Sequence, residues 1–254
     1  MTIELYRQYL AASEATPWDG QMTPYDWGQL PKSLNFGWAA YSMMFDEFSR
    51  EIANGVNQLS GYVHRLQAWS AVISSMGDEQ ELMVATHEFI EPIATISLTL
   101  PYVIRSRFIF AIAHLCHQAN QSLEGTAWKD DLPLDHEIEF PVADKYGRKW
   151  RSYPTCRSLL ERINDKKFQK DTHDFRHTYN HRFSPHVVLG ISQIVTRQVD
   201  PKSKGVTYAF GGIPPLKLDF VADLLTERCK RCYNAHDAFQ QLVREHETSI
   251  SACN

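Results

Sequence analysis

The sequence predicts an all-α fold, a helical bundle that carries two small β-hairpin insertions. Apolar residues recur at helical spacing along most of the 254-residue chain, as the buried faces of amphipathic helices require. Two stretches, about 137–153 and 191–210, instead resemble pairs of short strands around a turn. With 43% apolar and 22% charged residues, the composition is that of an ordinary globular protein, which excludes wholesale disorder.

Helices are expected in order along the chain. Their ranges are about 3–13, 35–75, 78–95, 101–123, 158–168, 171–183 and 218–247. Asp78 and Glu81 are spaced as a capping box and so predict the start of the third helix. Pro92 is expected to kink or end that helix. Pro101 is expected to open the next helix, because proline fits the first turn.

The other segments connect or extend these helices. The stretch 137–153 is interpreted as two strands around a turn at 144–147, and 191–210 as a hairpin whose turn contains Pro201 and Gly205. No repeat or linker is apparent, so one domain is expected. Its parts are an arm (1–34), helices (35–123), a hairpin insertion (128–153) and a part with the motif helix, the second hairpin and the last helix (154–247).

Cysteine content and hydropathy favour a cytoplasmic protein. The five cysteines lack the regular spacing of a secreted disulfide framework, so reduced thiols are expected. No signal peptide is visible. Glu91, Pro92 and Pro101 interrupt the most membrane-like stretch, 89–104, and we expect no contact with a membrane.

Charge is distributed unevenly. The formal net charge of -4 argues against a protein that coats nucleic acid non-specifically. Residues 145–182, however, hold eleven Lys and Arg against four Asp and Glu, a net charge of +7, while the remainder carries -11. Either this segment forms a surface that attracts phosphate, or it is a solvated helix face. The residues expected to bind RNA are Lys166, Lys167, Lys170 and Arg182.

Histidines concentrate in the helix expected over 171–183. His173, His177 and His181 are spaced i, i+4, i+8, so one helix face would carry all three. Arg176 precedes His181 by five positions. An ideal helix separates such positions by about 140°, so the two side chains converge only through the length of the arginine or in a groove between subunits.

This Arg-x4-His pattern on a late helix, followed by a further long helix, resembles the signature of the HEPN superfamily (higher eukaryotes and prokaryotes nucleotide-binding). The resemblance covers the helices at about 101–123, 156–183 and 218–247, with the hairpin at 191–210 as an insertion. It implies an all-α homodimer that cleaves single-stranded RNA without a metal or another cofactor. The implied setting is toxin–antitoxin biology or phage defence, with an antitoxin or another partner protein.

The resemblance also implies roles for single residues. His181 would act as general acid or base on the ribose 2′-hydroxyl or the leaving 5′-oxygen. Arg176 would stabilise charge on the scissile phosphate, His177 would orient His181, and Asn180 would position the phosphate. Attack by the 2′-hydroxyl would leave a 2′,3′-cyclic phosphate and restrict the activity to RNA. Weaker supporting candidates on the 101–123 helix are His114, His117 and Asn120.

Two other interpretations remain open. A catalytically silent member of the superfamily would bind RNA, a nucleotide or a partner protein through the same groove. A metal-binding helical enzyme would use His173, His177 and His181 as ligands. The glutamate that follows the first histidine in zinc hydrolases is absent, and Thr178 stands in its place.

Overall fold

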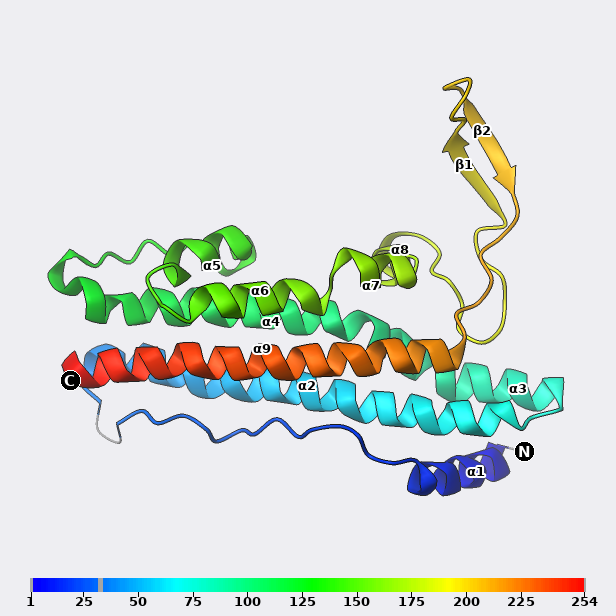
Figure 1. The fold of residues 1–254 in the computed structure, drawn as a ribbon, viewed down its shortest axis with the longest axis horizontal. Helices are drawn as coiled ribbons and strands as arrows, with labels where there is room; N and C mark the ends of the chain where they lie inside the picture. Colours follow the sequence, from blue (N-terminus) through cyan, green and yellow to red (C-terminus); the bar gives the residue numbers. More distant parts are fainter. Residues whose placement is uncertain (1, 32–33, 254) are drawn as a thin grey trace. The chain divides into compact units, whose positions relative to one another are not determined.

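The computed structural model describes residues 2–31 and 34–253, with helices and strands labelled in Figure 1. The long helices are α2 (Ala39–Ser74), α4 (Glu91–Glu124) and α9 (Leu218–Cys253). The other elements are α1 (Thr2–Ala15), η1 (Phe36–Trp38), α3 (Glu79–Ala85), the π-helical turn η2 (Thr86–Ile90), η3 (Gly125–Ala127), η4 (Asp135–Glu137), α5 (Phe140–Gly147), α6 (Tyr153–Ile163), α7 (Lys166–Asp171), α8 (Phe175–His181), β1 (Val195–Val199) and β2 (Val206–Phe210). A mostly helical fold is therefore confirmed.

The chain packs as two compact units, and each of the three long helices contributes residues to both. Unit 1 consists of Met1–Gly20, Ser60–Thr99 and Asp165–Glu227. Unit 2 consists of Gln21–Leu59, Leu100–Asn164 and Arg228–Asn254. Unit 1 thus holds α8 and the β1–β2 hairpin, whereas unit 2 holds α5 and α6.

In unit 1, an aromatic stack fixes α1 against α2 and η2. The ring centroid of Trp69 lies 4.9 Å from that of Tyr9 and 5.0 Å from that of Phe89, with interplanar angles of 13° and 20°. Stacked rings of this kind contribute about 1 kcal/mol beyond the area that they bury. His64 Nε2 lies 3.1 Å from the carbonyl oxygen of Thr16, just after α1. These contacts explain why the short first helix is held in place.

The path from α3 to α4 is continuous, so the expected break before Pro101 is wrong. Pro92 has no N–H, and the turn before it widens, so that the N–H of Glu91 bonds the carbonyl of Thr86, five residues back. Pro101 lies inside α4 and is buried, and burial of its surroundings offsets the hydrogen bond that it cannot make. The stretch Glu79–Ala127 is long and apolar enough to span a membrane, but 56% of its most apolar window is buried within the structure.

The hairpin expected at 137–153 is wrong, because this segment forms η4, α5 and the turn that leads to α6. Pro141 occupies the first turn of α5, where its fixed φ favours a helix. Trp150 is only 5% exposed, and its indole N–H donates to Asn120 Oδ1 at 2.9 Å. Packing against α4 therefore decides the structure of a stretch that reads locally as a pair of strands.

The single helix expected over 158–168 is divided into α6 and α7. Asp165 starts α7, because its carboxylate accepts the N–H of Phe168 at 2.8 Å. At the end of α6, the carbonyl of Arg162 accepts from Arg228 Nη1 at 3.0 Å and from Arg231 Nη1 at 2.7 Å. Both ends of the break are thus satisfied by side chains, as helix ends require.

In unit 2, a buried cluster of polar side chains joins the long helices. His246 on α9 is fully buried, and its Nδ1 lies 3.0 Å from the Tyr41 hydroxyl on α2. Its Nε2 lies 3.5 Å from Cys116 Sγ on α4, and the Trp150 ring packs 4.3 Å from the imidazole. Burial lowers the pKa of His246 to about 3 and raises the pKa values of Tyr41 and Cys116. All three groups are therefore neutral at neutral pH.

The low pKa of His246 makes the stability of the fold depend on pH. In the unfolded chain His246 binds a proton below pH ~6.5. In the folded chain it binds this proton only below about pH 3. We expect the free energy of unfolding to fall by about 1.4 kcal/mol per pH unit on this account as the pH decreases from ~6 to ~4. The measurement is urea unfolding at several pH values.

The matched variants are His246→Gln, whose amide can still bond Tyr41 and Cys116, and His136→Gln, which replaces an exposed histidine. Between pH ~6 and ~4, His246→Gln should reduce the slope of stability against pH by about 1.4 kcal/mol per pH unit. The slope due to His236, whose pKa burial lowers to about 4, should remain, and His136→Gln should leave the slope unchanged. An unchanged slope in His246→Gln would contradict the assignment.

Candidate functional site

The predicted motif lies on α8 in unit 1, and two residues in the left-handed region precede this helix. His173 and Asp174 have φ values of 53° and 52°, which reverse the chain between α7 and α8. His173 is therefore outside the helix, and the prediction that it shares a face with His177 and His181 is wrong. Asp174 occupies the N-cap position of α8, but its side chain makes no capping hydrogen bond.

The two remaining histidines lie together on the exposed face of α8. Phe175 and Thr178 are buried and anchor the helix on unit 1, and the Thr178 hydroxyl donates to the carbonyl of Asp174 at 3.0 Å. His177 and His181 are exposed, and their ring centroids lie 5.0 Å apart. The i, i+4 spacing thus gives an accessible pair of imidazoles, as the sequence predicts for these two residues.

Arg176 and Asn180 complete the motif on the same helix. Arg176 is half-buried, and Asn180 is exposed. Tyr179 stacks on Phe175 with ring centroids 5.9 Å apart, yet 53% of it stays exposed. Phe183, just beyond the helix, is 83% exposed. The helix therefore presents imidazole, amide and aromatic groups to solvent.

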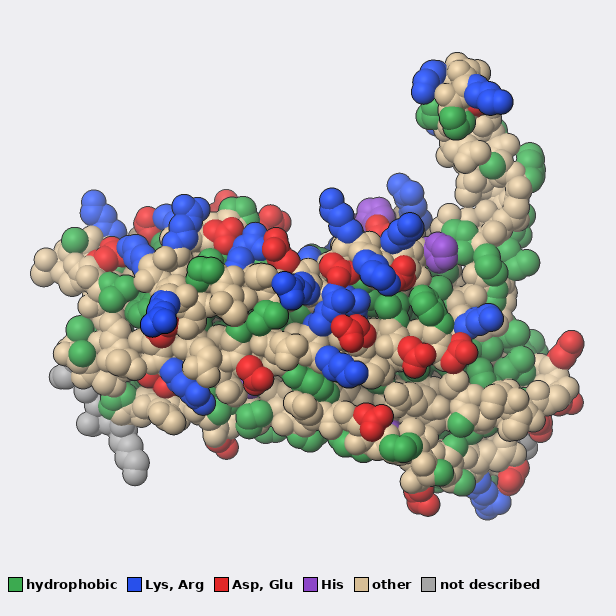
Figure 2. Space-filling view, in the orientation of Figure 1, with side chains coloured by type: hydrophobic (Ala, Val, Ile, Leu, Met, Phe, Trp, Pro, Cys, Tyr) green, Lys and Arg blue, Asp and Glu red, His purple; other side chains and the backbone are tan. Residues whose placement is uncertain are grey.

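Basic side chains lie on α7 and at the end of α8. In Figure 2, Lys and Arg side chains gather around the histidines over α7 and α8. Lys167 is neutralised by Asp171, with Nζ 2.6 Å from Oδ2. Lys166, Lys170 and Arg182 are exposed, and none of them has an ion pair among the described residues. The four predicted RNA-binding residues thus reduce to three that are available to a ligand.

In the unit 2 part of the basic segment, three of the six Lys and Arg side chains pair with carboxylates. Lys145 pairs with Asp131 at 2.7 Å and Lys149 with Glu124. Arg157 lies between two carboxylates, with Nε 2.8 Å from Asp144 Oδ1 and Nη1 2.6 Å from Glu161 Oε1. The net charge of +7 that the sequence shows for 145–182 therefore overstates the field that a phosphate would meet there.

The supporting candidates from α4 belong to unit 2, where they have partners of their own. His117 is 1% exposed, and its Nε2 lies 3.0 Å from Asp130 Oδ1. His114 Nε2 lies 3.2 Å from Asp135 Oδ1, and burial lowers the pKa of His114 although Asp135 opposes the shift. The two histidines therefore tie the segment after α4 back onto that helix.

Asn120 is a structural residue as well. It is 1% exposed, and it donates from Nδ2 to the carbonyl of Tyr146 at 3.2 Å while its Oδ1 accepts from Trp150. Its amide thereby bridges α5 and the turn before α6. A buried amide that is hydrogen-bonded at both ends helps to fix the fold.

A three-ligand metal site does not form in the part of the chain that the structure describes. No group of three or more His, Cys, Asp or Glu side chains comes together there. His177 and His181 are adjacent on α8, but His173 lies before the start of this helix. The geometry therefore does not favour the metal-binding interpretation, which needs at least three protein ligands.

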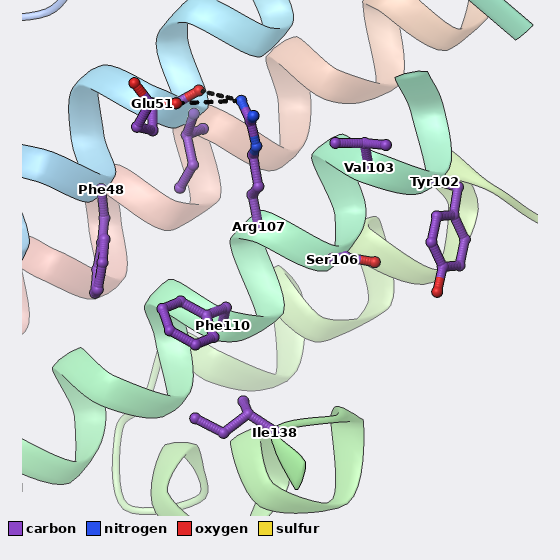
Figure 3. Close-up of a pocket in the computed structure, with 9 residues that line it drawn as sticks. Phe48, Glu51, Tyr102, Val103, Ser106, Arg107, Phe110 and Ile138 are labelled. Carbon is purple, nitrogen blue, oxygen red and sulfur yellow. Dashed lines mark hydrogen bonds and ion pairs between the residues drawn. The ribbon is translucent and has the colours of Figure 1, made fainter. Parts of the chain in front are cut away.

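The sequence did not reveal an apolar pocket of about 440 Å³ in unit 2. Figure 3 shows its walls, which are Phe48, Glu51, Ile52, Tyr102, Val103, Ser106, Arg107, Phe110 and Ile138. Arg107 Nη1 donates to the carbonyl of Glu51 at 3.2 Å and lies 3.4 Å from its carboxylate. Glu51 thus engages Nη1 of the guanidinium, and the pocket offers mainly apolar walls. Its aromatic residues are spaced along helices as core residues are, so no pattern distinguishes them.

Replacing Asn120 should destabilise the fold. Replacing Asn180 is the matched control and should not. Asn120→Ala leaves the Trp150 indole N–H and the Tyr146 carbonyl without their partner, at a cost of about 3 kcal/mol. Asn180 is exposed, and Asn180→Ala should change stability by less than about 0.5 kcal/mol. Urea unfolding measures both. Equal stability of the two variants would contradict the structural role of Asn120.

Comparisons of the chain with family models, with curated proteins and with solved structures found no match. The HEPN resemblance therefore remains a prediction that rests on the residues of α8 and on their helical setting.

Proposed function

We propose that unit 1 binds single-stranded RNA along α7 and α8 and cleaves it without a metal, as the HEPN resemblance implies, but with His177 as proton donor in place of the orienting role that the resemblance implies for it. The observation that carries the proposal is the exposed pair His177 and His181, with ring centroids 5.0 Å apart, on a helix that also holds Arg176. Two accessible imidazoles can share the two proton transfers that RNA cleavage needs.

The proposed reaction is an internal transfer at phosphorus. His181 takes the proton of the ribose 2′-hydroxyl as the 2′-oxygen bonds to phosphorus. The bond between phosphorus and the 5′-oxygen breaks, and His177 in its cationic form gives a proton to that oxygen. The products are a 2′,3′-cyclic phosphate and a 5′-hydroxyl end. Arg176 stabilises the charge that builds on the phosphate, for which its planar, permanently charged group is suited.

Basic and aromatic groups beside the histidines support an RNA substrate. Lys166, Lys170 and Arg182 are exposed and can meet phosphates, and the exposed rings of Tyr179 and Phe183 offer faces on which unpaired bases stack. The same side chains favour the second candidate, an RNA-binding module without catalysis. The two candidates differ only in what the imidazoles do, and a cleavage assay separates them.

Purified protein should cleave a labelled single-stranded RNA in the presence of EDTA. His181→Ala should lower the rate at least about 100-fold, because general acid–base catalysis contributes a factor of that order or more. His177→Ala should have a comparable effect if both imidazoles transfer protons. His136→Ala, which removes an exposed histidine of unit 2, should leave the rate unchanged.

Each outcome of this assay has a distinct meaning. Bound RNA that stays intact with the parent protein would favour the silent module. Cleavage that requires an added divalent cation would favour the metal-binding interpretation. Cleavage that survives in His181→Ala would overturn the assigned chemistry.

RNA binding should depend on Lys166 and Lys170 but not on Lys167. The plot of log affinity against log salt concentration has a negative slope, and the double variant Lys166→Gln with Lys170→Gln should make it less steep by roughly 1.4, since each phosphate contact to a single strand contributes about 0.7. Lys167→Gln is the matched control, because Asp171 already neutralises this lysine. Filter binding or fluorescence anisotropy at several salt concentrations gives the slopes. Equal slopes for the parent and the double variant would remove α7 from the interface.

A further inference from the structure

The β1–β2 hairpin of unit 1 exposes an unusual amount of apolar surface. Its strands pair antiparallel, and β1 and β2 form the two-stranded sheet by themselves. In Figure 1 the hairpin extends away from the helices of unit 1. A two-stranded hairpin is at best marginally stable in water, and apolar groups gathered on such an element mark an interaction surface.

The register places these groups on one face. The pairs Val195 with Phe210, Arg197 with Tyr208, and Val199 with Val206 alternate with the pairs of the opposite face, because side chains alternate along a strand. Phe210 is 82% exposed and Tyr208 63%. One face of the hairpin thus carries two exposed aromatic rings and a guanidinium flanked by valines. We call it the Tyr208 face.

The tip of the hairpin is positively charged. Asp200 organises the turn by accepting the N–H of Lys202 at 2.8 Å on its carboxylate and the N–H of Lys204 at 2.9 Å on its carbonyl. The N–H of Lys202, together with hydrogen bonds from Ser203, stabilises the carboxylate and lowers the pKa of Asp200. The side chains of Lys202 and Lys204 are exposed, and Figure 2 shows basic groups at the tip.

The root of the hairpin is connected to the end of α8. Gln193 Nε2 donates to the carbonyl of Phe183, just after α8, at 3.4 Å. Ser192 and Ile213 pair through their backbones in an isolated antiparallel β-bridge. Gly212, at φ 154°, has no room for a side chain, since a Cβ would lie 2.4 Å from Ile191 Cγ2. The hairpin is thus attached within the same unit as the proposed RNA site.

We propose that the Tyr208 face is a second RNA contact, on which unpaired bases stack while Lys202 and Lys204 meet the phosphates. The inference rests on the proposed RNA substrate of α8 and specifies it as a strand with unpaired bases that reaches beyond the α8 site. Aromatic rings interleaved with cationic side chains are the combination that binds single strands. Duplex RNA offers no free base face and should bind this surface poorly.

A second copy of the chain fits this face less well. An interface between two copies related by a two-fold axis would pack the face on itself. Arg197 lies at the middle of β1, so the two guanidiniums would meet near the axis, where burial of like charges is costly. The positive tip would add to this repulsion, whereas an RNA strand would be attracted by both features.

The test measures binding of a labelled unpaired RNA oligonucleotide by fluorescence anisotropy. Tyr208→Ala with Phe210→Ala should weaken binding about 10- to 100-fold, the range measured when stacked rings are removed. Gln198→Ala with Thr207→Ala is the matched control, because this register pair lies on the opposite face and should bind as the parent does. Melting temperatures within a few degrees of the parent would show that the folds are intact.

The outcomes distinguish this inference from the proposed function. Cleavage of RNA that persists with unchanged affinity in the Tyr208 and Phe210 variant would overturn the inference and leave the function standing. Loss of affinity in that variant, in a protein that never cleaves RNA, would keep the inference and overturn the function. Equal binding of duplex and unpaired RNA, or a change in mass by light scattering in the variant, would overturn the inference in favour of another ligand or of a second copy.

Discussion

Hydrogen bonds of buried polar side chains hold several segments of this chain against the long helices. In unit 2, the amide of Asn120 holds α5 and the turn before α6, and His117 ties the segment after α4. His246 joins three helices while staying neutral. Each of these groups would be costly to bury alone. The polar interior of unit 2 therefore specifies its packing.

The helical fold was predictable because its signal is periodic and long, whereas the errors concern short stretches. The apolar stripe of α9 and the turn residues of the β1–β2 hairpin identify both elements from sequence. The stretch at 137–153 looks like alternating strands, but Trp150 finds its partner thirty positions back on α4. A contact of that kind has no local signature.

The candidate site was predictable in part for the same reason. The spacing of His177 and His181 sets their adjacency on α8, since both lie within one helix. His173 departs because the chain reverses through two residues in the left-handed region, His173 and Asp174. His and Asp adopt this region more often than most residues other than glycine, but their presence alone does not locate a reversal. The positive charge of the segment 145–182 could be counted from the sequence. The pairing of Lys145 with Asp131 and of Lys149 with Glu124 depends on tertiary contacts, which the sequence does not show.

The bridge between Ser192 and Ile213 has a consequence for how this protein can vary during evolution. It brings the two ends of the intervening segment together, so the chain enters and leaves the hairpin at neighbouring points. The length and residues between these points can then change with little effect on the helices of unit 1, because closing a longer loop adds only a small entropic cost. The hairpin is in this sense a segment whose length and residues can change while α8 stays the same.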